Sequence, residues 1–198
     1  HDVQHCTARL TSSSRIYSFD LAKNTIQHVT VGINGAGASA MYSANLFINT
    51  VLKDKKITML DSKVVIHSER DNLTEWKKKF AIKTKNRTLN DAINGADVVL
   101  GLSQAGVLKK EMVKKMSKNP SVFACATPDP DITPEDVEDL RDEAIIATGR
   151  SDVPNQVNNL IGFPYIFRGA LDVRSRTINE EMKVAAAQAI AKLAREDV

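Results

Sequence analysis

Cysteine, long apolar runs and an excess of one charge are all scarce in this chain of 198 residues. Its two cysteines, Cys6 and Cys125, come without a secretory cue, so we expect free thiols in a reducing cytoplasm rather than a disulfide framework. No apolar run approaches the roughly 20 residues that cross a bilayer, and the N-terminus has no charged-then-apolar signal pattern. The net charge of +3 is small and the lysines are scattered. We therefore expect neither a membrane nor a nucleic-acid partner.

Short apolar runs alternate along the chain with stretches of helical pattern. At 42% hydrophobic and 26% charged residues, the composition is that of a globular protein with one core of ordinary size. The alternation predicts a Rossmann-like, doubly wound α/β fold, in which helices cover both faces of a mainly parallel sheet. We expect strands at residues 28–33, 57–60, 97–100, 121–125 and 144–147, and helices at residues 38–52, 73–81, 88–94, 109–116, 155–163 and 179–195.

A glycine-rich turn lies between the first expected strand and its helix. It fits the pattern G-x-G-x-x-G/A, in which the first glycine permits a sharp turn and the second lets the backbone approach a pyrophosphate. The third small residue lets helix and strand pack closely, and the helix N-terminus offers free N–H groups to phosphates. Because strand and helix flank it, the turn predicts dinucleotide binding by Gly35, Ala36, Gly37, Ala38, Ser39 and Ala40.

Two residues after the second expected strand bear on the choice of dinucleotide. Asp61 lies 26 positions after Gly35, slightly beyond the usual spacing of about 20 residues for a ribose-binding acid. Its carboxylate favours NAD, or it is an ordinary turn residue. Lys63 is cationic and would accommodate the 2′-phosphate of NADP. The residues alone leave this choice open.

The stretch 147–170 is a polar, amide-rich loop that runs into an apolar aromatic segment. As chemistry alone, it fits a capped loop before a helix equally well. As a string, ATGRSDVPNQVNNLIGFPYIFRGA closely resembles the C-terminal signature of bacterial malic enzymes, the NAD(P)-dependent oxidative decarboxylases of malate. The resemblance extends over nearly the whole chain. It implies that residues 1–198 are the NAD(P)-binding domain of such an enzyme, with residues 1–27 as a leading helix that has decayed.

The resemblance also implies roles for single residues. The complete family enzyme converts malate to pyruvate and CO2 with NAD(P)⁺ and Mg²⁺ or Mn²⁺. Ser103 and Gly106 fall in the family's loop over the cofactor, although Gly106 would also suit a simple turn. Thr127 stands where the family has an asparagine that contacts cofactor and substrate. Asn158 and Asn159 match a pair of which one touches the substrate carboxylate, and Asp2 matches an acid beside the catalytic base.

Several departures from the family pattern predict that this chain is catalytically silent alone. Val3 occupies the position of a divalent-metal ligand, and an isopropyl group offers no oxygen donor. The family's general-acid Tyr, general-base Lys and two other metal carboxylates precede the segment that begins at His1. The final residues 193–198 resemble the junction to a phosphotransacetylase-like domain in larger, mostly NADP-linked members, which slightly favours NADP.

Two further interpretations remain open beside a silent cofactor-binding domain. One is a non-enzymatic remnant or interaction module with a Rossmann fold, which the serine-rich residues 12–14 suggest. The other is a different Rossmann dehydrogenase acting on amino or hydroxy acids, against which the stretch 147–170 speaks. From the family resemblance we also expect a cytoplasmic homo-oligomer.

Overall fold

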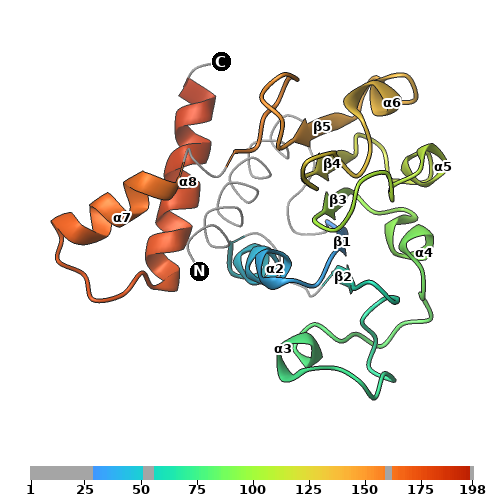
Figure 1. Cartoon of the computed structure of the whole chain (residues 1–198), viewed down its shortest axis with the longest axis horizontal. Coiled ribbons are helices and arrows are strands. Elements are labelled where there is room, and N and C mark those ends of the chain that lie inside the picture. Colours follow the sequence, from blue (N-terminus) through green and yellow to red (C-terminus); the bar gives the residue numbers. More distant parts are fainter. Residues whose placement is uncertain (1–28, 51–55, 159–161, 197–198) are drawn as a thin grey trace.

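Five parallel strands form a single sheet at the centre of the molecule (Figure 1). The computed structural model describes residues 29–50, 56–158 and 162–196. The strands stand in the order β2-β1-β3-β4-β5, and every neighbouring pair is parallel. This topology confirms the Rossmann-like, doubly wound fold. The strands are β1 (Val31–Asn34), β2 (Ile57–Leu60), β3 (Val98–Gly101), β4 (Ser121–Ala124) and β5 (Ile145–Thr148).

The helices that connect the strands begin where the sequence supplies caps. Thr88 and Asp91 form a reciprocal capping box before one short helix, and Thr133 followed by Pro134 begins another. Several are shorter than the pattern predicts: the helix expected at 73–81 covers four residues, as does that expected at 109–116. The helices are α2 (Ala38–Thr50), α3 (Glu75–Lys78), α4 (Leu89–Ile93), α5 (Lys110–Val113), α6 (Pro134–Glu138), α7 (Phe163–Asp172) and α8 (Glu180–Glu196).

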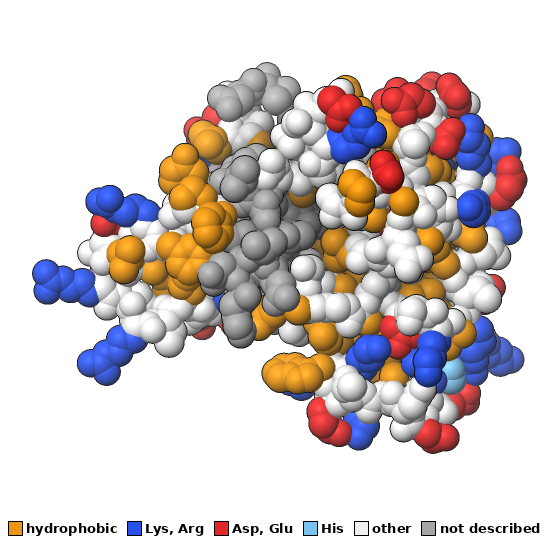
Figure 2. Space-filling model, in the orientation of Figure 1, with side chains coloured by type: hydrophobic (Ala, Val, Ile, Leu, Met, Phe, Trp, Pro, Cys, Tyr) orange, Lys and Arg blue, Asp and Glu red, His pale blue; other side chains and the backbone are white. Residues whose placement is uncertain are grey.

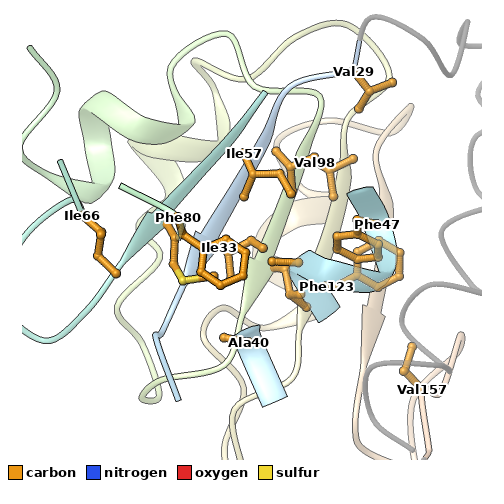
Figure 3. Packing of buried hydrophobic residues seen from close by; sticks show 14 of the residues in the cluster. Val29, Ile33, Ala40, Phe47, Ile57, Ile66, Phe80, Val98, Phe123 and Val157 are labelled. Carbon is orange, nitrogen blue, oxygen red and sulfur yellow. The ribbon is translucent and has the colours of Figure 1, made fainter. Parts of the chain in front are cut away.

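Helices cover both faces of the sheet, so each strand is apolar on both sides. On one face, Ile33, Val98 and Phe123 pack with Ala40 and Phe47 of α2, as Figure 3 shows. On the other face, alternate residues of the same strands meet a second apolar cluster. That cluster includes Ile93, Val99, Val113, Val122 and Val137, contributed by α4, α5 and α6 as well as the strands. The expected arrangement of helices on both faces is therefore confirmed.

The helix predicted at residues 155–163 is wrong over its described part. Residues 155–158 are not helical, and α7 begins only at Phe163. Asn155 adopts a left-handed backbone (φ 57°) and its side chain donates to the Ile146 carbonyl at 3.0 Å. The Val157 N–H donates to the Thr148 carbonyl at 2.7 Å. The segment therefore runs along β5 because strand-like bonds compete successfully with helix formation.

The two C-terminal helices, α7 and α8, extend to one side of the sheet (Figure 1). Helix α8 packs on α2. Figure 2 shows hydrophobic side chains gathered on this side of the molecule, and the exposed large ones of this part of the chain include Phe163, Tyr165, Leu171, Val173 and Leu193. Among the described residues, none of the helices has the length and apolar character needed to cross a membrane.

Candidate functional site

A cleft of about 590 Å³ opens at the carboxyl ends of β1, β2 and β3. The chain leaves β1 towards β2 on one side and later returns to β3 on the other, so the crevice outside β1 and β3 is the switch point where open α/β sheets bind ligands. Three loops line it, one after each of these strands. The lining includes Gly35, Ala36, Gly37, Asp61, Ser62, Lys63, Arg87, Ser103 and Gln104.

The glycine turn forms the floor of this cleft. Gly35 has φ +126°, and a Cβ there would lie 3.0 Å from the Leu102 carbonyl oxygen, so both conformation and space require glycine. A Cβ at Gly37 would meet no atom within 4 Å. The backbone at Gly37 therefore faces open space, as close approach of a pyrophosphate requires. Ala40, 1% exposed, lies in the first turn of α2 and packs against the sheet, as the third small residue should.

The loop after β3 is fixed against the glycine turn. The Leu102 N–H donates to the Asn34 carbonyl at 2.8 Å. The Asn34 side-chain amide donates to the Ser103 hydroxyl at 2.7 Å. These bonds join the ends of β1 and β3 and place Ser103 on the cleft wall, where its hydroxyl is partly exposed to a ligand.

The carboxylate of Asp61 is held by two cations rather than being free. Arg70 binds it with both terminal nitrogens, Nη1 to Oδ1 at 3.1 Å and Nη2 to Oδ2 at 3.0 Å. Lys77 Nζ adds a contact to Oδ2 at 2.8 Å, and the Lys63 backbone N–H donates to Oδ1 at 3.1 Å. Burial alone would raise the pKa of Asp61, but these hydrogen bonds outweigh it and hold that pKa far below its usual range.

Two further cations lie at the same end of the cleft. Lys63 is exposed, and no ion pair involves its ammonium group among the described residues. Arg87 lines the cleft while one of its nitrogens binds Glu69 at 2.8 Å. Figure 2 shows Lys and Arg side chains gathered over this part of the molecule, where β2 leads to α3. The end of the cleft beyond β2 is therefore positively charged.

A family model described as the malic enzyme, NAD binding domain, matches residues 5–198. The chain belongs to this family. It is 49% identical to the NADP-dependent malic enzyme of Halomonas elongata, covering 100% of this chain and 47% of that protein. It is 46% identical to the NAD-dependent malic enzyme of Rhizobium meliloti, covering 100% of this chain and 26% of that protein. The chain thus spans between about a quarter and a half of these malic enzymes.

The fold agrees with a solved malic enzyme. The structure of Entamoeba histolytica malic enzyme matches with a TM-score of 0.94 at 37% identity, covering 100% of this chain and 43% of that one. Homologues named as NAD-dependent and as NADP-dependent both match this chain. Membership of the malic enzyme NAD-binding domain family therefore establishes a dinucleotide-binding domain without deciding which dinucleotide it prefers.

Only some of the site residues predicted from the sequence line the cleft. Gly35, Ala36, Gly37, Asp61, Lys63 and Ser103 line it, with Ala38 and Ser39 behind them in the first turn of α2. Gly106 (φ +64°) lies in a second cavity of about 420 Å³ on the far side of the loop after β3. Thr127 is exposed and precedes a cis bond to Pro128, and Asn158 is half-buried. Asp2, Val3 and Asn159 lie outside the described residues.

Sequence reasoning missed the residues that set the charge around the cleft. Arg70 and Arg87 come from irregular segments and Lys77 from α3, and none of these local patterns marks its residue as part of the cleft. It also missed Asp131, which follows β4 and is 1% exposed. Among the described residues, no group of three or more His, Cys, Asp or Glu side chains is placed to hold a metal ion. The described part of this malic enzyme domain therefore offers a dinucleotide cleft and no metal centre.

Proposed function

We propose that this chain is the dinucleotide-binding part of an NADP-dependent malic enzyme. The complete protein would oxidise malate and release CO2 to give pyruvate, and it would act as a cytoplasmic homo-oligomer. Membership of the malic enzyme NAD-binding domain family supports the reaction class. The observation that carries the preference for NADP is the pairing of Asp61 with Arg70 and Lys77.

An acid at the end of the second strand favours NAD in two ways: it accepts hydrogen bonds from the ribose 2′-hydroxyl, and it repels a 2′-phosphate. Both oxygens of Asp61 are already bound by cations. With Arg70 and Lys77 both charged, this group of three carries a net charge of +1. The repulsion that would exclude NADP is therefore removed. Lys63 and Arg87, on the same cleft wall, would then pair with the 2′-phosphate.

The remaining assignments follow the loops. The glycine turn at Gly35 and Gly37 and the N-terminus of α2 would hold the pyrophosphate. Ser103 and Thr127 would contact the cofactor from the loops after β3 and β4. NADP⁺, when bound, supplies the hydride acceptor. From the family resemblance we also propose that Asn158 and Asn159 bind the malate carboxylate, and that Asp2 lies beside the catalytic base.

The proposal is tested by titrating the 198-residue chain with NADP⁺ and with NAD⁺ by calorimetry. We expect tighter binding of NADP⁺. Lys63→Gln should weaken NADP⁺ binding about tenfold, or about 1.4 kcal/mol, and leave NAD⁺ binding unchanged. Lys78→Gln is the matched control, since Lys78 is an exposed lysine outside the cleft, and it should change neither.

Two outcomes would count against the proposal. Tighter binding of NAD⁺ than of NADP⁺ would contradict the role given to the Asp61 pairing. Failure of the chain to bind either dinucleotide would favour a non-enzymatic remnant with a Rossmann fold.

A further inference from the structure

Asp131 lies in the turn between β4 and α6 and is almost completely buried, at 1% exposure. Its Oδ2 accepts a hydrogen bond from the Ala126 N–H at 3.0 Å, which closes the turn that carries Thr127. Its own carbonyl accepts from the Leu108 N–H at 3.1 Å. Asp131 therefore touches both the loop that leaves β4 and the loop that leaves β3.

The carboxyl group of Asp131 also packs directly on the last residue of β3. A Cβ added at Gly101 would lie only 2.2 to 2.4 Å from the Asp131 carboxyl atoms, so that position admits glycine alone in this arrangement. Gly101 leads into Leu102 and Ser103, which line the cleft. The next loop is tied in as well, because the Gly106 N–H donates to the Pro130 carbonyl at 3.1 Å. Moving the Asp131 carboxyl group would therefore move the wall of the cleft.

The carboxyl group of Asp131 has few partners for a buried acid. Its Oδ1 has no hydrogen-bond partner among the described residues. Burial raises the pKa of Asp131 to about 6, and backbone N–H groups, that of Ala126 foremost, only partly offset this. The Cys125 thiol, whose pKa burial raises to about 12, stays neutral beside it.

The charged side chains that face Asp131 across the second cavity have partners of their own. Lys110 Nζ lies 2.8 Å from Asp136 Oδ1, and Arg150 is paired with Asp152. Lys109 Nζ donates to a backbone carbonyl group at 2.7 Å. Asp129, on the same turn, is exposed. None of these groups forms an ion pair with Asp131 among the described residues, so its carboxyl group titrates by itself.

We propose that Asp131 is a positioning residue whose uncharged carboxyl group holds the loops after β3 and β4 together, so that its ionisation loosens the wall of the dinucleotide cleft. This inference rests on the proposed function. Its direction follows from linkage: an acid that binds its proton more tightly when buried favours the buried, closed arrangement when protonated. Dinucleotide affinity should therefore fall as the pH rises through about 6.

The test compares the wild-type chain with Asp131→Asn, a neutral isostere that cannot ionise. Binding of NAD⁺ and NADP⁺ is titrated by calorimetry from pH 5 to pH 8. The ratio of the wild-type Kd to the variant Kd should rise on the order of tenfold over this range. Using the ratio cancels titration of the ligand and of shared groups. Asp129→Asn, an exposed acid on the same turn, is the control and should follow the wild type.

A second measurement needs no variant. In wild-type protein, the amide resonance of Ala126 should shift with a midpoint near pH 6, since its N–H donates to the Asp131 carboxyl group. An Ala126 amide that does not titrate between pH 4.5 and 7.5 would overturn the inference, as would parallel binding profiles of wild type and Asp131→Asn. Wild type that binds neither dinucleotide at any pH would instead overturn the proposed function.

Discussion

Asp61 and Asp131 lie at the same carboxyl edge of one sheet, and the side chains of both are largely shielded from solvent, yet their pKa values move in opposite directions. The Asp61 side chain is 8% exposed and is bound by Arg70 and Lys77, which hold its pKa far below the usual range. Asp131 is 1% exposed and has no cation, and burial raises its pKa to about 6. Burial pushes both pKa values upwards. The hydrogen-bonding partners therefore decide the charge of each carboxyl group.

The two carboxyl groups consequently have different tasks. The pKa of Asp61 lies far below its usual range, so Asp61 is ionised at neutral pH and acts as a fixed anchor for two cations. Asp131 changes charge close to neutral pH, so it can respond to its surroundings. Substitutions that remove this difference, or that isolate its cause, test the comparison.

The largest effect is expected from Asp61→Asn, which leaves Arg70 buried without its counter-ion. Arg70 is 8% exposed in its side chain, and breaking such a pair costs roughly 3–5 kcal/mol of unfolding free energy. Urea denaturation at pH 7, followed by circular dichroism, measures this loss. Glu75→Gln is the control, because its pair with Lys78 is exposed to solvent and its loss should change stability far less. Equal losses for the two variants would show that Asp61 is no anchor.

An intermediate effect is expected from Asp131→Asn, and it depends on pH. The folded pKa of about 6 lies above the ordinary value of 3.8. The stability from this group is therefore complete below about pH 4 and is lost as the pH rises through 6. Relative to Asp131→Asn, the wild type should lose about 2 kcal/mol of unfolding free energy between pH 4.5 and pH 7. Urea denaturation at both pH values checks this, and a constant difference between the proteins would contradict it.

The smallest effect on stability is expected when only one of the two cations that bind Asp61 is removed. Lys77→Gln removes one of them and should cost about 1 kcal/mol, since Lys77 is only half-buried and Arg70 still neutralises the carboxylate. Lys78→Gln, on the next residue, loses only an exposed pair with Glu75 and should cost less than Lys77→Gln. Urea midpoints of the two variants give the difference. Identical midpoints would mean that Arg70 alone sets the charge of Asp61.

Most of the fold followed from local patterns. All five strands were predicted, because a parallel sheet covered on both faces requires continuous apolar runs that stand out from the sequence. The glycine turn was recognisable because strand and helix flank it. The helix expected at 155–163 failed because Val157 and Asn155 bond to β5, and no local pattern reports a partner in another element.

The charge of the site could not be predicted for the same reason. Arg70 and Lys77 lie 9 and 16 residues beyond Asp61, Arg70 in an irregular segment and Lys77 in α3. No local pattern at either position marks it as a partner of Asp61. Asp131 stands in an acidic turn that looks solvated from sequence alone. Its burial became apparent only from the packing against Gly101.

The pairing of Asp61 with Arg70 and Lys77 also limits how cofactor preference can change by mutation. Freeing the carboxylate for a ribose hydroxyl requires removal of both cations. Arg70, however, also donates to the carbonyl groups of Val64 and Val65, at 3.3 and 3.4 Å. Replacing Arg70 would therefore remove hydrogen bonds that hold the segment after β2, and it would destabilise that segment before cofactor specificity changed. On the proposed preference for NADP, a conversion towards NAD would take several coupled substitutions through a destabilised intermediate.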